Sequence, residues 1–171
     1  MSISEPLTLR LYPDPILSQR CLPVACYDTA LRDLAHAMLV AMRAEHGVGL
    51  AANQVGVSSR LFVMSGDVDD GGDRIIVNPE ILSRDGVGEL EEGCLSLPGL
   101  RYRLDGRAEL ITLRYQDLNG SWHVENLHGI AALCVQHEID HLDGITMIER
   151  LSPLKAGRAR VRLIKERKKK N

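Results

Sequence analysis

The chain has 171 residues, of which 44% are hydrophobic and 26% charged, with a formal net charge of −2 at pH 7. These values predict a single globular domain over residues 1–171. The first residues lack a basic segment followed by an apolar run, and no stretch reaches membrane-spanning length. We therefore expect no signal peptide and no membrane partner. Four cysteines without a close pair favour a reducing, cytoplasmic location.

The first predicted element is a helix at residues 28–47. Asp28 is suited to be its N-cap, leucines and methionines form an apolar stripe, and Gly47 supplies a stop. Two β-rich runs follow at 60–64 and 74–78, and a loop rich in Gly and Asp separates them.

The second half of the chain contains a predicted hairpin and two helices. Residues 108–117 and 122–127 are strand-like and flank 118–121, where an Asn-Gly pair predicts a tight turn. A helix over about 129–142 follows, and a third begins after Pro153. Strands and helices do not alternate regularly, so the predicted fold class is α+β.

The C-terminal segment is strongly basic. Residues 155–171 hold nine Lys or Arg against one Glu, a local charge of +8, which leaves −10 for the first 154 residues. One interpretation is a solvated helix end that aids solubility. The other is a surface over the helix and tail at 153–171 that binds a polyanion such as RNA.

The stretch "QHEIDHLDG" (136–144) indicates a metal site. His137 and His141 are just over one helical turn apart, so both project from the same face and can bind one ion. Glu138 would lie beside any water bound there. A lone histidine on such a face is usually a core residue, but two at ligand spacing with an acid between them favour a metal.

The third ligand is less obvious from the sequence. The extended peptidase signature H-E-x-x-H-x-x-G-x-x-H keeps Gly144 here but has Met147 in place of the last histidine. Glu149 is too near His141 along the chain, and Glu166 lies in the basic tail. Cys94, in "EEGCLSLPG", would bind as thiolate and leave a fourth position for water. Its alternative role is that of a small buried hydrophobe.

A third stretch, "HGVGLAANQVG" (46–56), follows the first helix. Gly47 and Gly49 remove side chains where another backbone could approach closely, and Gln54 offers a neutral amide donor. The alternative is a helix cap followed by a turn of small residues.

Taken together, these stretches resemble the peptide deformylase family. Its motifs G-x-G-L-A-A-x-Q, E-G-C-L-S and Q-H-E-x-x-H-x-x-G appear in order as 47–54, 92–96 and 136–144. The similarity runs from "YPDPIL" to "LSPLK" and is closest to the bacterial type with a C-terminal helix. It implies mixed or antiparallel sheets packed around a central metal-binding helix, with one helix near each end of the chain.

The resemblance also implies an activity, the hydrolysis of the formyl group from N-formylmethionyl nascent peptides with release of formate. It implies one divalent metal ion per chain, natively Fe²⁺ and often replaced by Zn²⁺ or Ni²⁺, held by Cys94, His137 and His141. Glu138 would be the general acid and base. Gln54 and the backbone N–H of Leu95 would stabilise the oxyanion.

Substrate-binding residues follow from the same resemblance. The peptide would lie as an added strand along Gly47, Val48 and Gly49. The methionine pocket would be lined by Val48, Ile130, Leu133 and Cys134. In "GLRYRLDGR" (99–107) the chain lacks a proline that many relatives have, so the equivalence of Arg101 and Arg107 to family arginines stays open. Arg101 is taken as the substrate-binding one.

Two other functions fit parts of the sequence. A gluzincin-like metallopeptidase would need a carboxylate as third ligand. A structural metal site in an RNA-binding protein would normally be closed by four protein ligands. If the chain is a deformylase, as the resemblance implies, its basic C-terminal helix would contact the ribosome, where such substrates emerge. DNA is not an expected partner.

Overall fold

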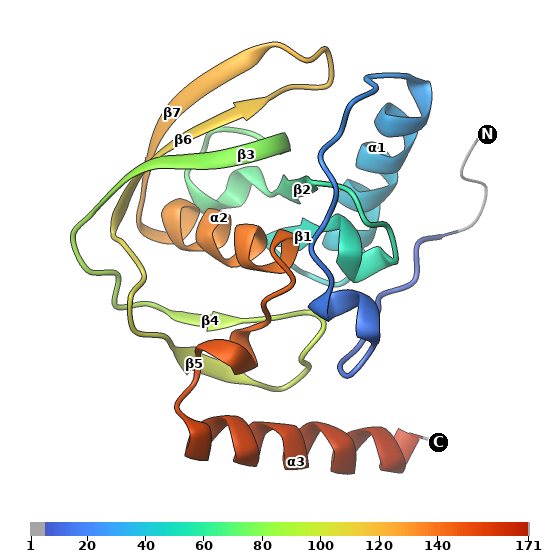
Figure 1. Cartoon of the computed structure of the whole chain (residues 1–171), viewed down its shortest axis with the longest axis vertical. Coiled ribbons are helices and arrows are strands. Elements are labelled where there is room, and N and C mark those ends of the chain that lie inside the picture. Colours follow the sequence, from blue (N-terminus) through green and yellow to red (C-terminus); the bar gives the residue numbers. More distant parts are fainter. Residues whose placement is uncertain (1–5, 171) are drawn as a thin grey trace.

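The structure, a computed structural model, describes residues 6–170 and is built on two β-sheets (Figure 1). Five strands form the larger sheet in the order β1-β2-β3-β6-β7, with antiparallel neighbours throughout. They are β1 (Gly49–Ala51), β2 (Leu61–Met64), β3 (Arg74–Asp85), β6 (Leu110–Gln116) and β7 (Trp122–His128). The smaller sheet pairs β4 (Glu91–Gly93) with β5 (Arg101–Arg103), also antiparallel.

Helix α2 (Gly129–Leu142) lies at the centre of the molecule, between the larger sheet and the β4–β5 pair (Figure 1). Its Ala131, Ala132 and Val135 are fully buried in one cluster with Phe62 and Leu113 of the sheet. The sheet's alternating burial in β6 reflects this packing, because every second side chain points at the helix. The predicted α+β class and its central helix are confirmed.

Helix α1 (Thr29–Ala44) covers the β1–β2 end of the sheet. The predicted cap is confirmed, since the Asp28 side chain accepts a hydrogen bond of 3.0 Å from the N–H of Leu31. The helix ends earlier than expected, and His46, not Gly47, takes the left-handed conformation with φ of 55°. The chain then enters β1, which is an edge strand of the sheet.

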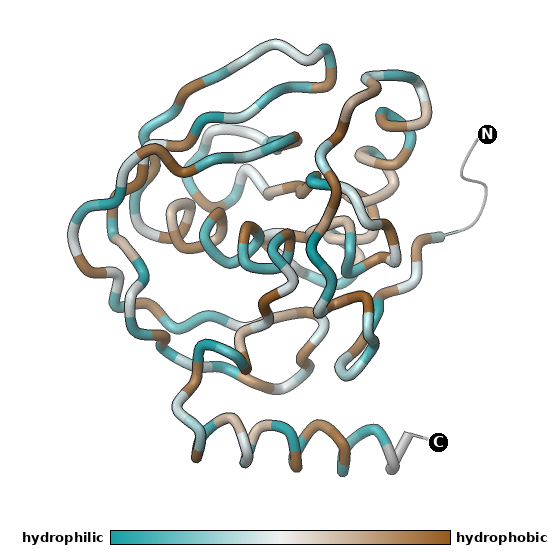
Figure 2. The backbone as a smooth tube through the Cα atoms, in the orientation of Figure 1, coloured by the Kyte–Doolittle hydropathy of each residue, from teal (hydrophilic) through white to brown (hydrophobic). Residues whose placement is uncertain are grey.

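Helix α3 (Pro153–Lys170) packs on the β4–β5 side of the molecule (Figure 1). Ala156, Ala159 and Leu163 are buried against Leu97 and Leu100, which belong to the segment that follows Cys94. Hydrophobic and hydrophilic positions alternate along α3 in Figure 2. The helix therefore contributes to a third core cluster in addition to carrying basic charge.

The observed strands differ from the predicted ones in two ways: short strands are added, and β3 is longer. The three-residue strands β1 and β5 are not predicted, because three residues are too few to establish an alternating pattern, and β4 lies in the segment 91–99, whose sequence is compatible with a short strand or a loop. Strand β3 continues well beyond residue 78, and the hairpin at 118–121 joins β6 and β7 as expected. Single 3₁₀ turns complete the chain: η1 (Pro15–Ser18), η2 (Ala52–Val55), η3 (Gly66–Val68) and η4 (Met147–Arg150).

No helix within residues 6–170 is both long enough and apolar enough to cross a bilayer. A single domain over residues 1–171 stays a prediction, and its residues 1–5 and 171 lie outside the described part of the chain.

Candidate metal centre

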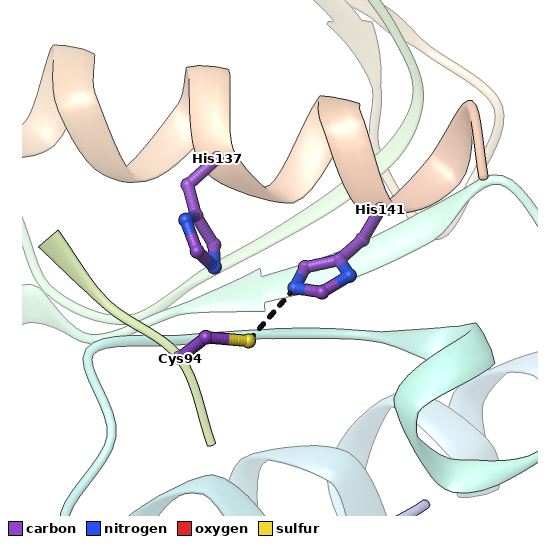
Figure 3. A group of neighbouring side chains, drawn as sticks. All are labelled: Cys94, His137 and His141. Atoms are coloured by element: carbon purple, nitrogen blue, oxygen red, sulfur yellow. Dashed lines mark hydrogen bonds between the residues drawn. The ribbon is translucent and has the colours of Figure 1, made fainter. Parts of the chain in front are cut away.

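One sulfur and two imidazoles converge between α2 and the end of β4. His137 and His141 project from the same face of α2 toward Cys94, which follows β4 directly (Figure 3). The potential ligand atoms of the three residues all lie within 4.8 Å of one another, and Cys94 Sγ is 3.2 Å from His141 Nε2. The two rings meet edge to face, with centroids 4.9 Å apart.

This geometry suits one metal ion. Bonds of about 2.3 Å to sulfur and 2.0–2.1 Å to nitrogen, at tetrahedral angles, place two ligand atoms roughly 3.3–3.6 Å apart. The Cys94–His141 separation of 3.2 Å is just below that range. Burial and the neighbouring His137 hold the pKa of His141 well below its usual value, so its ring is neutral, the form that binds metals. If these three side chains of the described residues bound an ion, a fourth position would remain for water, as in catalytic sites.

A carboxylate orients one of the two histidines. Glu92 Oε2 lies 2.5 Å from Nδ1 of His137, and both side chains are buried. Burial would raise the pKa of Glu92, but hydrogen bonds from His137 and Arg107 outweigh it and lower the pKa to about 2. An ionised acceptor at Nδ1 holds a proton there and keeps the ring turned so that Nε2 faces the cysteine (Figure 3).

Glu138 follows His137 on α2 and is buried. Its side chain is 3% exposed, and among the described residues its Oε2 has no hydrogen-bond partner. Burial raises the pKa of this carboxyl to about 7. Because an unpartnered buried oxygen is costly, this atom marks a place where a polar group from outside the chain belongs.

Gln54, on η2, lies next to Cys94. Its Oε1 accepts a hydrogen bond of 2.9 Å from the N–H of Ala51, which fixes the orientation of the amide. The Nε2 group consequently points toward the site, 3.7 Å from Cys94 Sγ and 3.1 Å from Ser96 Oγ. A neutral donor is thus held beside the cysteine.

Comparison with known proteins identifies the family of the chain. A sequence model described as polypeptide deformylase matches residues 6–157, which is most of the chain. The chain belongs to the polypeptide deformylase family.

Individual deformylases are similar over nearly their whole length. The peptide deformylase of Alkalilimnicola ehrlichii is 46% identical over 162 residues, covering 93% of this chain and 89% of the relative. That of Chromobacterium violaceum is 40% identical over 165 residues, covering 96% and 98%. The crystal structure of a peptide deformylase from Legionella pneumophila superposes with a TM-score of 0.89 at 40% identity, covering 95% of this chain and 96% of that one.

The two motif glycines lie against side chains of this same chain. A Cβ at Gly49 would be 2.4 Å from Glu138 Oε1 and 2.7 Å from Cys134 Sγ. A Cβ at Gly47 would be 2.7 Å from Cδ1 of Leu95. The sequence suggested that these glycines make room for an incoming backbone. The structure shows that they already make room for Glu138, Cys134 and Leu95.

The four residues expected to line a methionine pocket differ in exposure. Val48 and Ile130 are about half exposed, whereas Leu133 and Cys134 are buried. Cys134 packs close to the first motif, with its Sγ 3.6 Å from the carbonyl oxygen of Val48. Helix α2 and the first motif therefore meet beside Glu138.

Arg101 and Arg107, whose roles the sequence left open, differ in their burial and in their contacts. Arg101 is exposed on β5, and its Nε is 3.9 Å from Oε2 of Glu91. Arg107 is buried and bonds Glu92 and Asp140.

Glu92 was missed as a functional residue by the sequence reasoning. It is the middle residue of β4 and lies two positions before Cys94, and because alternate residues of a strand share a face, this spacing was the available signal.

Proposed function

We propose that Cys94, His137 and His141 hold one divalent metal ion and that this centre removes the formyl group from N-formylmethionyl peptides. The observation that carries the proposal is the convergence of three candidate ligands, one of them next in the chain to Glu138, whose buried Oε2 lacks a hydrogen-bond partner among the described residues. We propose Fe²⁺ as the native ion, as the family resemblance implies, with Zn²⁺ or Ni²⁺ as replacements that the same thiolate and two imidazoles suit. A metal bound there would polarise the formyl carbonyl and make water a better nucleophile.

Glu138 is the proposed proton carrier. Its free Oε2 accepts the proton of the attacking water as the bond to the formyl carbon forms. The same carboxyl then gives a proton to the departing amine while the carbon–nitrogen bond breaks. Formate and a peptide with a free N-terminus are the products.

Gln54 and Leu95 are the proposed oxyanion donors. The Nε2 of Gln54 is already aimed at the site by the Ala51–Gln54 hydrogen bond. Leu95 follows the cysteine ligand directly, so its backbone N–H is carried by the same turn. Donors placed before the reaction stabilise charge as it develops on the formyl oxygen.

The peptide is proposed to bind along β1. This strand is at the edge of the larger sheet, and among the described residues β2 is its one strand partner there, so its other edge can accept an added strand at Gly47, Val48 and Gly49. The methionine side chain would lie against Val48, Ile130, Leu133 and Cys134, and its burial contributes roughly 1.5–3 kcal/mol. The exposed guanidinium of Arg101 is proposed to contact the downstream part of the peptide.

The decisive experiment is formate release from formyl-Met-Ala-Ser by anaerobically purified protein with its metal content measured. We expect one ion per chain and rapid turnover, and acetyl-Met-Ala-Ser, which differs by one methyl group, should be a poor substrate. Glu138→Gln is the matched inactive control because it keeps the size of the side chain. Absence of formate release by the metal-loaded protein would refute the function. A gluzincin-like peptidase would instead cut an unformylated peptide internally.

The ribosome is the proposed partner of α3. The described part of this helix exposes six basic side chains on its surface, at positions 155, 158, 160, 162, 165 and 167. Such a density of positive charge favours a polyanionic partner such as ribosomal RNA. We propose a cytoplasmic location because that is where a ribosomal partner would be met.

The ribosome contact is best tested by changing charge, because Ala159 and Leu163 of α3 are part of the core. Arg158→Glu combined with Lys165→Glu should weaken co-sedimentation with ribosomes, most clearly at low salt, and leave short-peptide hydrolysis intact. Arg84→Glu, an exposed change on β3, is the control. Equal ribosome binding by all three proteins would contradict the contact.

A further inference from the structure

A continuous series of ionic contacts runs from the metal centre across α2. Glu92 accepts from His137 at 2.5 Å and from Arg107 through both of its oxygens, at 2.8 and 2.9 Å. The third nitrogen of Arg107, Nη1, donates to Asp140 Oδ2 at 2.7 Å. Arg150 then bonds the same aspartate, with its Nε 3.1 Å from Oδ2.

The inner members of this series are removed from solvent. Arg107 and Asp140 are each 7% exposed and Glu92 is 5% exposed. Buried ion pairs of this kind are weak contributors to stability, because desolvation offsets most of their attraction. We therefore attribute these three buried charges to a role in setting the geometry of the neighbouring ligand, His137.

Arg107 donates two parallel hydrogen bonds to Glu92, and this fork restricts the orientation of the carboxylate. Two parallel N–H···O bonds hold a carboxylate in one plane, which a single ammonium group cannot do. Arg107 lies between β5 and β6, Glu92 is on β4, and Asp140 is on α2 one turn from His137. The guanidinium thus fixes the strand that precedes Cys94 relative to the helix that carries both histidines.

We infer that Arg107 is a positioning residue for the metal centre: through Glu92 it keeps His137 turned so that Nε2 faces the ion. Asp140 holds Arg107 in place from the other side, and Arg150 in turn holds Asp140. This inference rests on the proposed metal site. It predicts a graded effect of substitutions, largest at Arg107, smaller at Asp140 and smallest at Arg150.

The test is metal affinity, measured by competition between the protein and a chelator for Co²⁺. Arg107→Met should weaken Co²⁺ binding by about 10–100-fold, the usual effect of removing a group that orients a ligand. Arg107→Lys should give a smaller loss, because it keeps the charge but not the fork. The Co²⁺ absorption bands, which report the ligand geometry, should shift in both variants.

Arg74→Met is the matched control. Arg74 also makes two bonds to one carboxylate, Asp69, at 2.9 and 3.0 Å, and a third to Glu125, but these partners are not metal ligands or their neighbours. It should lower the midpoint of thermal unfolding and leave Co²⁺ affinity and spectrum unchanged. A purely structural role for Arg107 would give the same result as this control.

The outcomes are separable. If wild-type protein binds no ion through Cys94, the proposed function fails. If wild-type protein binds Co²⁺ normally and the Arg107 variants match Arg74→Met, only this inference fails. Should Arg107→Met not fold, Arg107→Lys and Asp140→Asn decide the matter, and wild-type Co²⁺ affinity in both would overturn it.

Discussion

Gly49→Ala tests how closely the first motif is fitted to Glu138. The backbone of Gly49 does not have a positive φ, so alanine is acceptable there for the main chain. The added methyl group would, however, be only 2.4 Å from Glu138 Oε1, where ordinary contact begins near 3.4 Å. The carboxylate must therefore move by about 1 Å, and a displacement of that size can lower a rate by about 10²-fold.

We expect Gly49→Ala to lower kcat for formyl-Met-Ala-Ser by about 10²-fold, with the metal still bound, because the three ligands are not displaced directly. Crowding against the buried Cys134 should also cost about 1–3 kcal/mol of stability, measured by urea unfolding. Gly157→Ala is the control, since a Cβ there has no neighbour within 4 Å. It should stabilise α3 by about 0.5–1 kcal/mol and leave kcat unchanged.

A Gly49→Ala variant that kept its metal and turned over within twofold of wild type would refute this reasoning. The double variant with Cys134→Ala separates the two close contacts. It removes the contact with the Cys134 sulfur but leaves the Glu138 carboxylate displaced, so the free energy of unfolding should recover while kcat stays low. Recovery of kcat would show that the sulfur contact, and not displacement of Glu138, caused the loss.

Three further changes probe other parts of the molecule. Gln54→Leu should lower kcat by about 10²–10³-fold through loss of an oxyanion donor, with metal content unchanged by elemental analysis; normal turnover would remove Gln54 from the mechanism. Cys94→Ala should lose its ion to a chelator that the wild type withstands, whereas a peptidase with a carboxylate ligand would keep it. The pKa of Asp69 is lowered by hydrogen bonds from Arg74, so its carboxylate stabilises the fold above the unfolded pKa and this contribution disappears as pH falls. The difference in unfolding free energy between wild type and Asp69→Asn should therefore shrink below about pH 4, and a constant difference would contradict the ion pair.

Much of the local structure followed from the sequence because its causes are local. The cap at Asp28, the hairpin at 118–121 and the helix that carries the histidines each depend on a few neighbouring residues. The spacing of His137 and His141 is likewise a property of one helix. These features needed no knowledge of distant contacts.

The assembled site depended on tertiary structure. Cys94 could be proposed as a ligand from the sequence, but only the fold brings its Sγ to 3.2 Å from His141, 47 residues away. The same is true of Glu92 and Arg107, whose roles depend on contacts between β4, the β5–β6 connection and α2. Three-residue strands such as β4 also form only when a partner strand supplies their hydrogen bonds.

By itself, then, the sequence determined which chemical groups this protein has and which of them share a helix face. Their distances, their burial and the pairing of Glu92 with His137 were decided by tertiary packing. The physical reason is that burial and orientation depend on residues far apart in the chain, whereas caps, turns and helical spacing are settled within a few residues.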